Sequence, residues 1–114
     1  MRYLISVATL LLLAGNCLAQ SPALSGNQIR KLFAGRTIIG TESGERYSET
    51  LLPDGALLGR SKSEGEYDGE WSVDGDELCF SYEDEEEDCS RVAVQGAKII
   101  FIGDGEADTY ATLK

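Results

Sequence analysis

Histidine is absent from this chain of 114 residues, and proline and methionine are scarce, with two and one residues. Without histidine, Ser-His-Asp and Cys-His catalysis, the common zinc sites and histidine-ligated haem lose their usual residues. A mass of 12.3 kDa leaves room for one small domain. We therefore expect a non-enzymatic protein with no cofactor and no bound metal.

Acidic residues are plentiful, and composition alone does not exclude a carboxylate pair of the glycosidase kind. Such a pair needs a cleft in which two neighbouring environments separate two pKa values. A chain of this size offers little wall from which to build that cleft. We therefore predict no catalytic residues.

Basic residues are few, with 10 Lys and Arg against 20 Asp and Glu, and the formal net charge is −10. A surface of this sign repels the phosphates of nucleic acid and of anionic lipid. Neither is expected as a partner.

The N-terminal residues have the pattern of a secretory signal peptide. One positive charge precedes an apolar run over residues 4–14, and Cys17 and Ala19 stand three before and immediately before a cut. The run is shorter than the roughly 20 residues of a membrane-spanning helix. A retained anchor and a lipoprotein at Cys17 are the alternatives, and Asn16 stands where the lipoprotein signal needs a small residue. We predict cleavage after Ala19, which gives a periplasmic or secreted protein without membrane insertion.

Cleavage leaves Cys79 and Cys89, an even count in an exported domain. Placed opposite each other in a hairpin, they have the Cα separation that a disulfide between neighbouring strands allows. We predict a structural disulfide, with free thiols or a metal pair as alternatives. A redox-active role is not expected, because the spacing is not that of a Cys-x-x-Cys motif.

One short helix is expected near the start of the mature chain. Residues 20–26 are predicted to be a flexible arm. Residues 25–35 then offer a capping serine, apolar Ile29, Leu32 and Phe33 at helical spacing, and a terminating glycine. A helix this short is not stable alone, so these apolar residues are expected to cover a sheet.

From residue 36 onward, short apolar or alternating runs end in turn sequences at intervals of about ten residues. Pro53-Asp54-Gly55 and Asp74-Gly75 are two such turns. We expect a mainly β fold, an antiparallel up-and-down meander that closes into a small lipocalin-like barrel, within a single domain over residues 27–114. An open sheet or a flattened sandwich is the alternative. The eight predicted strands lie at residues 36–41, 46–52, 56–61, 66–73, 77–82, 88–94, 98–102 and 108–113.

Alternation along two of these strands separates an inner from an outer face. Tyr67 and Trp71 point to one side of their strand, and Phe80 and Tyr82 continue that side on the next. At alternating positions such residues are typical of a barrel core, and a pocket for a small apolar ligand is the alternative. The candidate pocket residues are Tyr67, Trp71, Phe80 and Tyr82.

Charge is segregated, because thirteen acidic residues and no basic one lie between Lys62 and Arg91. Six of them are consecutive and are expected at the tip of the disulfide-linked hairpin. A solvated tip, a low-affinity cation site and a docking surface for a basic partner are the three readings. No twelve-residue EF-hand ligand spacing is present. The candidate surface consists of Glu83, Asp84, Glu85, Glu86, Glu87 and Asp88.

The order of the helix, Pro53-Asp54-Gly55, Gly69-Glu70-Trp71, Cys79 and Cys89 resembles a family of small exported alphaproteobacterial proteins of unknown function. The resemblance spans nearly the whole mature chain and implies fold and export, but no activity. Through Gly69, Trp71 and Cys79 the chain is more distantly similar to periplasmic barrel inhibitors of secreted metalloproteases.

These observations leave a binding or accessory protein of the bacterial cell envelope, which binds a small apolar ligand or a protein partner. One alternative is a protein that resembles the protease inhibitors and acts through its N-terminal arm, residues 20–26. Another is weak cation binding at the acidic hairpin. A cavity lined by aromatic side chains would favour small-ligand binding, and a filled barrel would favour protein contact.

Overall fold

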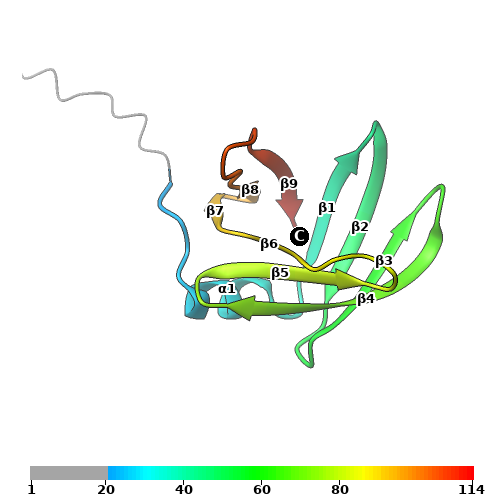
Figure 1. The fold of residues 1–114 in the computed structure, drawn as a ribbon, viewed down its shortest axis with the longest axis horizontal. Helices are drawn as coiled ribbons and strands as arrows, with labels where there is room; N and C mark the ends of the chain where they lie inside the picture. The colour runs from blue at the N-terminus through cyan, green and yellow to red at the C-terminus, as the bar shows by residue number, and fades with distance from the viewer. Residues whose placement is uncertain (1–20) are drawn as a thin grey trace, which may run out of the picture.

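The computed structural model describes residues 21–114, so the predicted signal peptide lies outside the described residues. Nine antiparallel strands and one short helix form a nearly closed barrel (Figure 1), which confirms the mainly β fold. The elements are α1 (Gly26–Phe33), β1 (Thr37–Glu42), β2 (Glu45–Leu51), β3 (Ala56–Ser61), β4 (Gly65–Asp74), β5 (Glu77–Tyr82), β6 (Asp88–Ser90), β7 (Val92–Gln95), β8 (Lys98–Phe101) and β9 (Thr109–Leu113).

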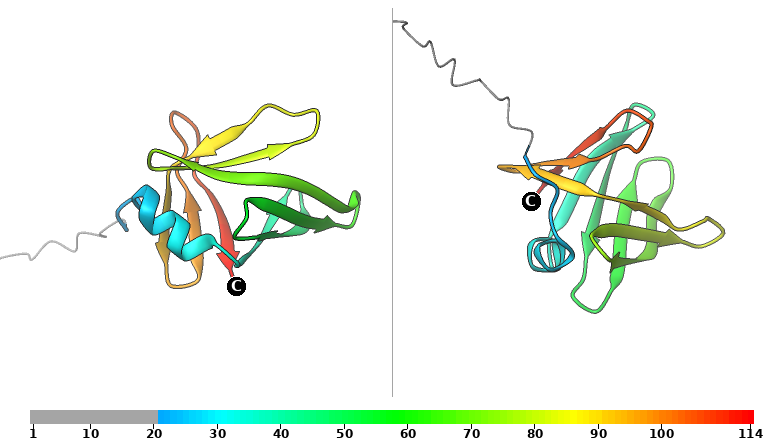
Figure 2. Two further views of the ribbon diagram at one scale, coloured as in Figure 1. Left: turned by 90° about the horizontal axis from the view of Figure 1, so that it is seen from below. Right: turned by 60° about the vertical axis from the view of Figure 1, so that its left-hand side comes forward.

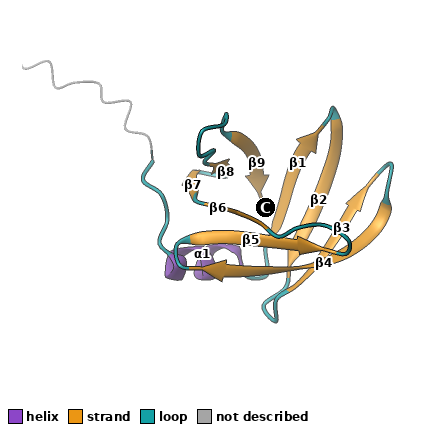
Figure 3. Cartoon of the chain, viewed as in Figure 1, coloured by secondary structure: helices purple, strands orange, loops and turns teal. Residues whose placement is uncertain are grey.

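The barrel is closed by one stretch of chain that changes partner at Arg91. The sheet order is β6-β5-β4-β3-β2-β1-β9-β8-β7, so its two edges, β6 and β7, follow each other in the sequence (Figure 3). β6 pairs with β5 and β7 pairs with β8, while the Arg91 carbonyl accepts a hydrogen bond from the Ile102 N–H at 2.9 Å. The expected single strand over residues 88–94 is therefore split, because each half pairs with a different neighbour.

The helix begins where the sequence predicts it, at a capping box. The Ser25 side chain accepts a hydrogen bond from the Gln28 N–H, and the Gln28 side chain accepts one from the Ser25 N–H. The N–H of Gly26 donates to Asp76 Oδ1 at 2.7 Å, which ties the helix to the turn between β4 and β5. A Cβ at position 26 would collide with the Gly75 carbonyl, so this close approach requires glycine.

α1 closes one end of the barrel (Figure 2). Ile29 and Phe33 are fully buried, and Leu32 packs against the same cluster, as predicted. The N–H of Leu24 donates to the Val92 carbonyl at 2.8 Å, so the expected arm is attached to the barrel at this residue. The main core residues contributed by strands are Ile38, Leu51, Leu57, Trp71, Leu78, Val92 and Ile99.

Apart from the junction of β6 and β7 at Arg91, the connections between strands alternate between the two ends of the barrel, as in an up-and-down topology. The β2–β3, β4–β5 and β7–β8 turns lie at the end with α1, which we call the closed end. The β1–β2, β3–β4, β5–β6 and β8–β9 connections lie at the other end, which we call the open end. No helix within residues 21–114 is long and apolar enough to cross a membrane.

Candidate functional site

A half-open hollow of about 1010 Å³ occupies the open end of the barrel. Aromatic side chains from five strands line it, together with polar residues of the four connections at this end. Tyr67 and Tyr82 meet edge to face with ring centroids 6.1 Å apart, and Phe80 and Phe101 do so at 6.3 Å. The aromatic lining includes Tyr47, Tyr67, Phe80, Tyr82 and Phe101.

Glu49 lines this hollow from the middle of β2 and is 7% exposed. Its Oε2 accepts hydrogen bonds from the hydroxyls of Tyr67 and Tyr82, both at 2.7 Å. These separations are typical of hydroxyl donors on a carboxylate. Among residues 21–114, Glu49 is the one buried residue with a charged side chain.

Oε1 of Glu49 differs from Oε2 because no group in the described chain donates a hydrogen bond to it. No side-chain oxygen in the described chain is both sealed from solvent and unpaired. Oε1 is therefore accessible to solvent and to a ligand from the hollow. The carboxylate is held by its inner oxygen and presents the other to whatever enters.

Three pairs of glycine and tyrosine shape this part of the wall. Gly40 lies opposite Tyr47, Gly59 opposite Tyr67, and Gly69 opposite Tyr82 on neighbouring strands. A Cβ at Gly40 or Gly59 would overlap the facing tyrosine, and one at Gly69 would lie 2.6 Å from the Ser81 carbonyl oxygen and 3.0 Å from Tyr82 Cδ1. The glycines thus let the tyrosine rings lie flat against the wall, which leaves the hollow open above them.

Burial raises the pKa of Tyr67 and of Tyr82 well above the ordinary value of 10.0. The hydrogen bond to Glu49 and then its negative charge act in the same direction, since both favour the neutral phenol. Burial also raises the pKa of Tyr47, with further contributions from the charges of Glu49 and Glu42. Near neutral pH all three hydroxyls are therefore protonated donors.

The rim of the hollow is acidic. Among residues 21–114, eleven carboxylate residues line the hollow and no lysine or arginine does. Acidic residues lie in or beside each of the four connections at the open end. Two ion pairs occur within residues 21–114, Arg60–Glu66 at 2.6 Å and Arg91–Asp104 at 3.3 Å, and the second neutralises one rim acid. Six of the rim acids are Glu42, Glu45, Glu64, Glu83, Glu85 and Glu86.

Three of the four candidate pocket residues, Tyr67, Phe80 and Tyr82, line the hollow. Trp71 does not: it is 8% exposed within the core cluster, and its indole N–H donates to the Leu52 carbonyl at 2.7 Å. It shares the inner face of β4 with Tyr67 but lies four residues nearer the closed end. For Trp71 the structure thus agrees with the core interpretation and not with the pocket alternative, because alternation identifies the face of a strand but not the depth along it.

Sequence reasoning missed Glu49 and Tyr47. Both lie on the inner face of β2, in alternation with the buried Leu51, and the register with β3 places Glu49 opposite Gly59. Alternation in residues 45–51 was a signal that could have identified them. A glutamate in an inner position is unusual unless another group hydrogen-bonds to it, which made the pattern hard to recognise.

The predicted acidic surface lies at the β5–β6 connection and at the start of β6, as a hairpin tip does. All six residues are exposed, and none pairs with a basic side chain within the described chain. Glu87 differs from its neighbours because its Oε2 accepts a hydrogen bond from the Ser81 hydroxyl at 3.2 Å. The tip therefore forms part of the rim of the hollow, with Glu83, Glu85, Glu86 and Asp88 lining it.

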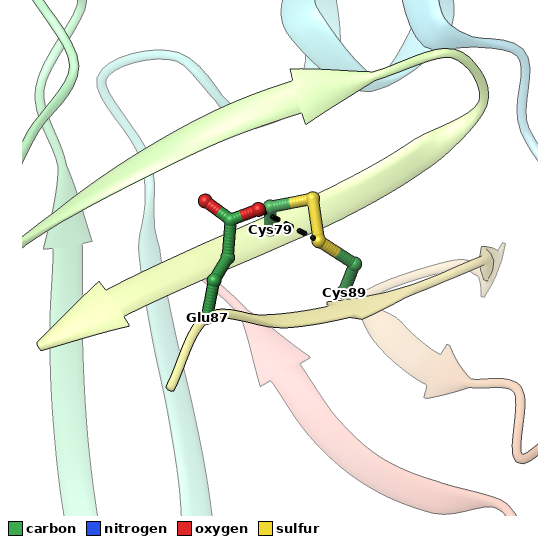
Figure 4. A group of neighbouring side chains, drawn as sticks. All are labelled: Cys79, Glu87 and Cys89. Carbon is green, nitrogen blue, oxygen red and sulfur yellow. Dashed lines mark hydrogen bonds between the residues drawn. A yellow bond between two sulfur atoms is a disulfide. The ribbon is translucent and has the colours of Figure 1, made fainter. Parts of the chain in front are cut away.

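The disulfide between Cys79 and Cys89 is present and joins directly opposite residues of β5 and β6 (Figure 4). Cys79 is 1% exposed. Oε1 of Glu87 lies 3.4 Å from Cys89 Sγ, which in the disulfide has no proton to donate. This cluster is unsuited to metal binding, because both sulfurs are occupied by the covalent bond. No other group of three potential ligands in residues 21–114 brings its atoms close enough to hold one ion.

Comparison with models of protein families, with curated proteins and with solved structures gives no match. The resemblance to exported alphaproteobacterial proteins therefore stays a prediction from the sequence. Any assignment of function depends on the geometry of the hollow.

Proposed function

We propose that this protein is an exported, non-enzymatic binding protein of the bacterial cell envelope that holds a small molecule in the hollow. One observation supports this above the others: the barrel is filled and covered at one end, while the other end encloses about 1010 Å³ bordered by aromatic side chains. A volume of this order suits a small-molecule ligand, and a mouth of a β-barrel is a usual place for one.

The chemistry of the hollow supports binding over catalysis. Glu49 is the buried carboxylate, and its hydrogen-bond partners are Tyr67 and Tyr82. Because their pKa values are raised, these phenols are poor proton acceptors or donors in a reaction near neutral pH. They serve instead to hold the carboxylate in one orientation.

Export is supported by the disulfide, since such bonds persist in oxidising compartments. N-terminal sequencing of the protein from its native cells tests this part of the proposal. A start at Gln20 is expected. A lipid attached to Cys17, or an intact N-terminus, would contradict it.

Binding in the hollow is tested with N-phenyl-1-naphthylamine, an uncharged apolar dye whose fluorescence rises on leaving water. The informative variant is Thr109→Trp, because Thr109 lines the hollow opposite Phe101 and is exposed. We expect saturable binding by the wild type and at least a tenfold weaker affinity in this variant, because the indole occupies the hollow.

Thr112→Trp is the matched control, since Thr112 is exposed on the same strand but does not line the hollow. It should bind the dye as the wild type does. Equal weakening by both variants, or no saturable binding by the folded wild type, would contradict the proposal.

The alternative through the N-terminal arm has less support. Leu24 is attached to Val92 and packs against the core, so three described residues precede the point of attachment. The hollow, in contrast, brings together residues from most of the strands.

A further inference from the structure

We propose that the hollow selects an organic cation, a primary amine attached to an apolar body, whose ammonium group binds Oε1 of Glu49. This inference rests on the proposed function, since it names the class of ligand for the same hollow. Three features of the hollow support it: a buried carboxylate, the aromatic rings around that carboxylate, and a lining that contains no basic residue among residues 21–114.

Glu49 is a buried carboxylate without a basic partner in the described chain. It is 93% buried, since 7% of it is exposed. A buried charge is costly unless it is paired or fully hydrogen-bonded. Tyr67 and Tyr82 satisfy Oε2 alone, which leaves Oε1 available from the hollow. An ammonium group supplies both the missing charge and a hydrogen-bond donor.

The acidic residues at the open end create a negative electrostatic potential there. Acidic residues lie in or beside each of the four connections at the mouth, and low-dielectric walls concentrate the electric field within a cleft of one charge sign. This field attracts cations and repels carboxylates and phosphates. Fatty acids and other anionic amphiphiles are therefore excluded, and an uncharged apolar ligand gains nothing from Glu49.

Aromatic side chains line the hollow around Glu49. Tyr67 and Tyr82 flank the carboxylate, and the faces of such rings attract cations. Phe80 of β5 and Phe101 of β8 also line the hollow, where their rings meet edge to face, and they offer an apolar surface to the rest of the ligand. A ligand with both a charged end and an apolar body fits these two sets of contacts.

A bare metal ion fits the hollow less well. Calcium takes six to eight oxygen ligands, and the described chain brings no three carboxylate oxygens of separate residues within 4.8 Å of one another. Oε2 of Glu49 is already occupied by two hydroxyls. One free carboxylate oxygen is suited to a single ammonium group.

The test compares dansylcadaverine, which has a primary ammonium group, with its N-acetylated derivative, which has the same apolar body and no charge. Affinities are measured by fluorescence in 1 M NaCl, where the Debye length of about 3 Å screens the exposed rim acids. We expect the wild type to bind the amine at least tenfold more tightly than the acetylated probe.

Glu49→Gln is the informative variant, because it removes the charge and keeps an oxygen that accepts hydrogen bonds from the tyrosines. We expect the preference for the amine to fall to about twofold or less, with little change for the acetylated probe. Glu70→Gln is the matched control. Glu70 is exposed on β4 and does not line the hollow, so the preference should remain.

The outcomes separate the two proposals. If wild type and Glu49→Gln bind the two probes equally well, the hollow is a binding site but the cation assignment is wrong. If neither probe binds while N-phenyl-1-naphthylamine does, the cation assignment is wrong and the binding function stands. If the dye does not bind saturably either, the proposed function fails as well. If Glu49→Gln does not fold, the cation assignment is tested by nuclear Overhauser effects in the wild-type complex. The assignment predicts contacts between the aminomethylene protons of the amine and the rings of Tyr67 and Tyr82. Their absence in the saturated complex would overturn the assignment.

Discussion

The two ends of this barrel are built from the same strands and differ in almost every property. β2 runs from Glu45 at the open end, through Tyr47 and Glu49, to the fully buried Leu51 at the closed end. At the closed end, apolar side chains from α1 and the strands fill the interior. At the open end the same inner face carries phenols and a carboxylate around a hollow. One regular alternation thus places apolar side chains at the closed end and polar groups at the open end.

The difference shows how a domain this small can keep a hollow at one end while its core fills the other. The closed end concentrates the buried apolar surface, which is the dominant favourable contribution to folding. The open end has its polar groups held by specific hydrogen bonds and its glycines matched to tyrosines. We infer that stability depends mainly on the closed end.

Truncation of a core ring should separate the two ends most clearly. Phe33→Ala at the closed end should lower the free energy of unfolding by about 3 to 5 kcal/mol, because Phe33 is fully buried. Phe101→Ala at the open end should cost less than half as much, since Phe101 is partly exposed to the hollow. Urea denaturation measures both. Equal losses would show that the open end contributes as much to folding as the closed end.

The disulfide links β5 to β6, the two strands of the hairpin that carries the acidic tip. Replacing both Cys79 and Cys89 with alanine should lower the free energy of unfolding by about 2.5 to 3 kcal/mol, since the bond closes a loop of about ten residues. For a domain of this size the melting temperature should fall by roughly 10 °C or more. An unchanged melting temperature on reduction would contradict a structural role.

Gly40→Ala tests the pairing of glycine with tyrosine. The added methyl group overlaps the ring of Tyr47, and relief of such crowding typically costs about 1 to 3 kcal/mol. Tyr47→Ala should remove most of this penalty, so the double variant should be more stable than the sum of the single effects indicates. Additive effects in denaturation experiments would mean that the two side chains do not compete for space.

Alkaline pH should weaken the open end specifically. The pKa of Tyr82 is higher in the folded state than in the unfolded chain, where it is about 10. The unfolded state therefore loses its proton first, so the contribution of this group is complete below pH 10 and declines as pH rises above it. Tyr82→Phe should show a shallower decline. The same variant should cost about 1 to 3 kcal/mol at neutral pH, because Glu49 loses a donor. Parallel pH profiles for both proteins would contradict this account.

The smallest effect is expected at the acidic tip. Replacing Glu83, Glu85 and Glu86 with glutamine should raise the free energy of unfolding by less than about 1 kcal/mol at low salt, because exposed charges interact weakly. At 1 M NaCl the gain should vanish. Glu87 is left unchanged because Ser81 donates to it. A loss of stability at every salt concentration would mean that these carboxylates make structural contacts.

Regular features of the fold could be predicted from the sequence because local chemistry determines them. The capping serine at position 25 and the opposite cysteines act through near neighbours or through strand pairing, and the structure confirms both. The turn predicted at Asp74-Gly75 is present one residue later, with Gly75 and Asp76 between the paired Asp74 and Glu77. Gly75 has φ 59°, a conformation that glycine adopts without strain.

The break at Arg91 and the role of Glu49 depend on closure of the barrel. The partner change at Arg91 occurs where β5 and β8 approach the same segment, and no local pattern encodes that meeting. Glu49 and its two hydrogen-bond partners lie on different strands, up to 33 residues apart in the sequence. The candidate site was therefore predicted in part, through its aromatic residues, while its buried carboxylate required the three-dimensional structure.

Hydrogen exchange along β2 tests the contrast between the ends most directly, because one strand passes through both. The amide of Leu51, which donates to the Arg36 carbonyl at 2.9 Å, should exchange only when the whole domain unfolds. Amides of residues 45–47 should exchange through local opening, at a free energy clearly below that of global unfolding. Uniform protection from Glu45 to Leu51, at the global value, would contradict the claim that the closed end holds the fold and leaves the open end for binding.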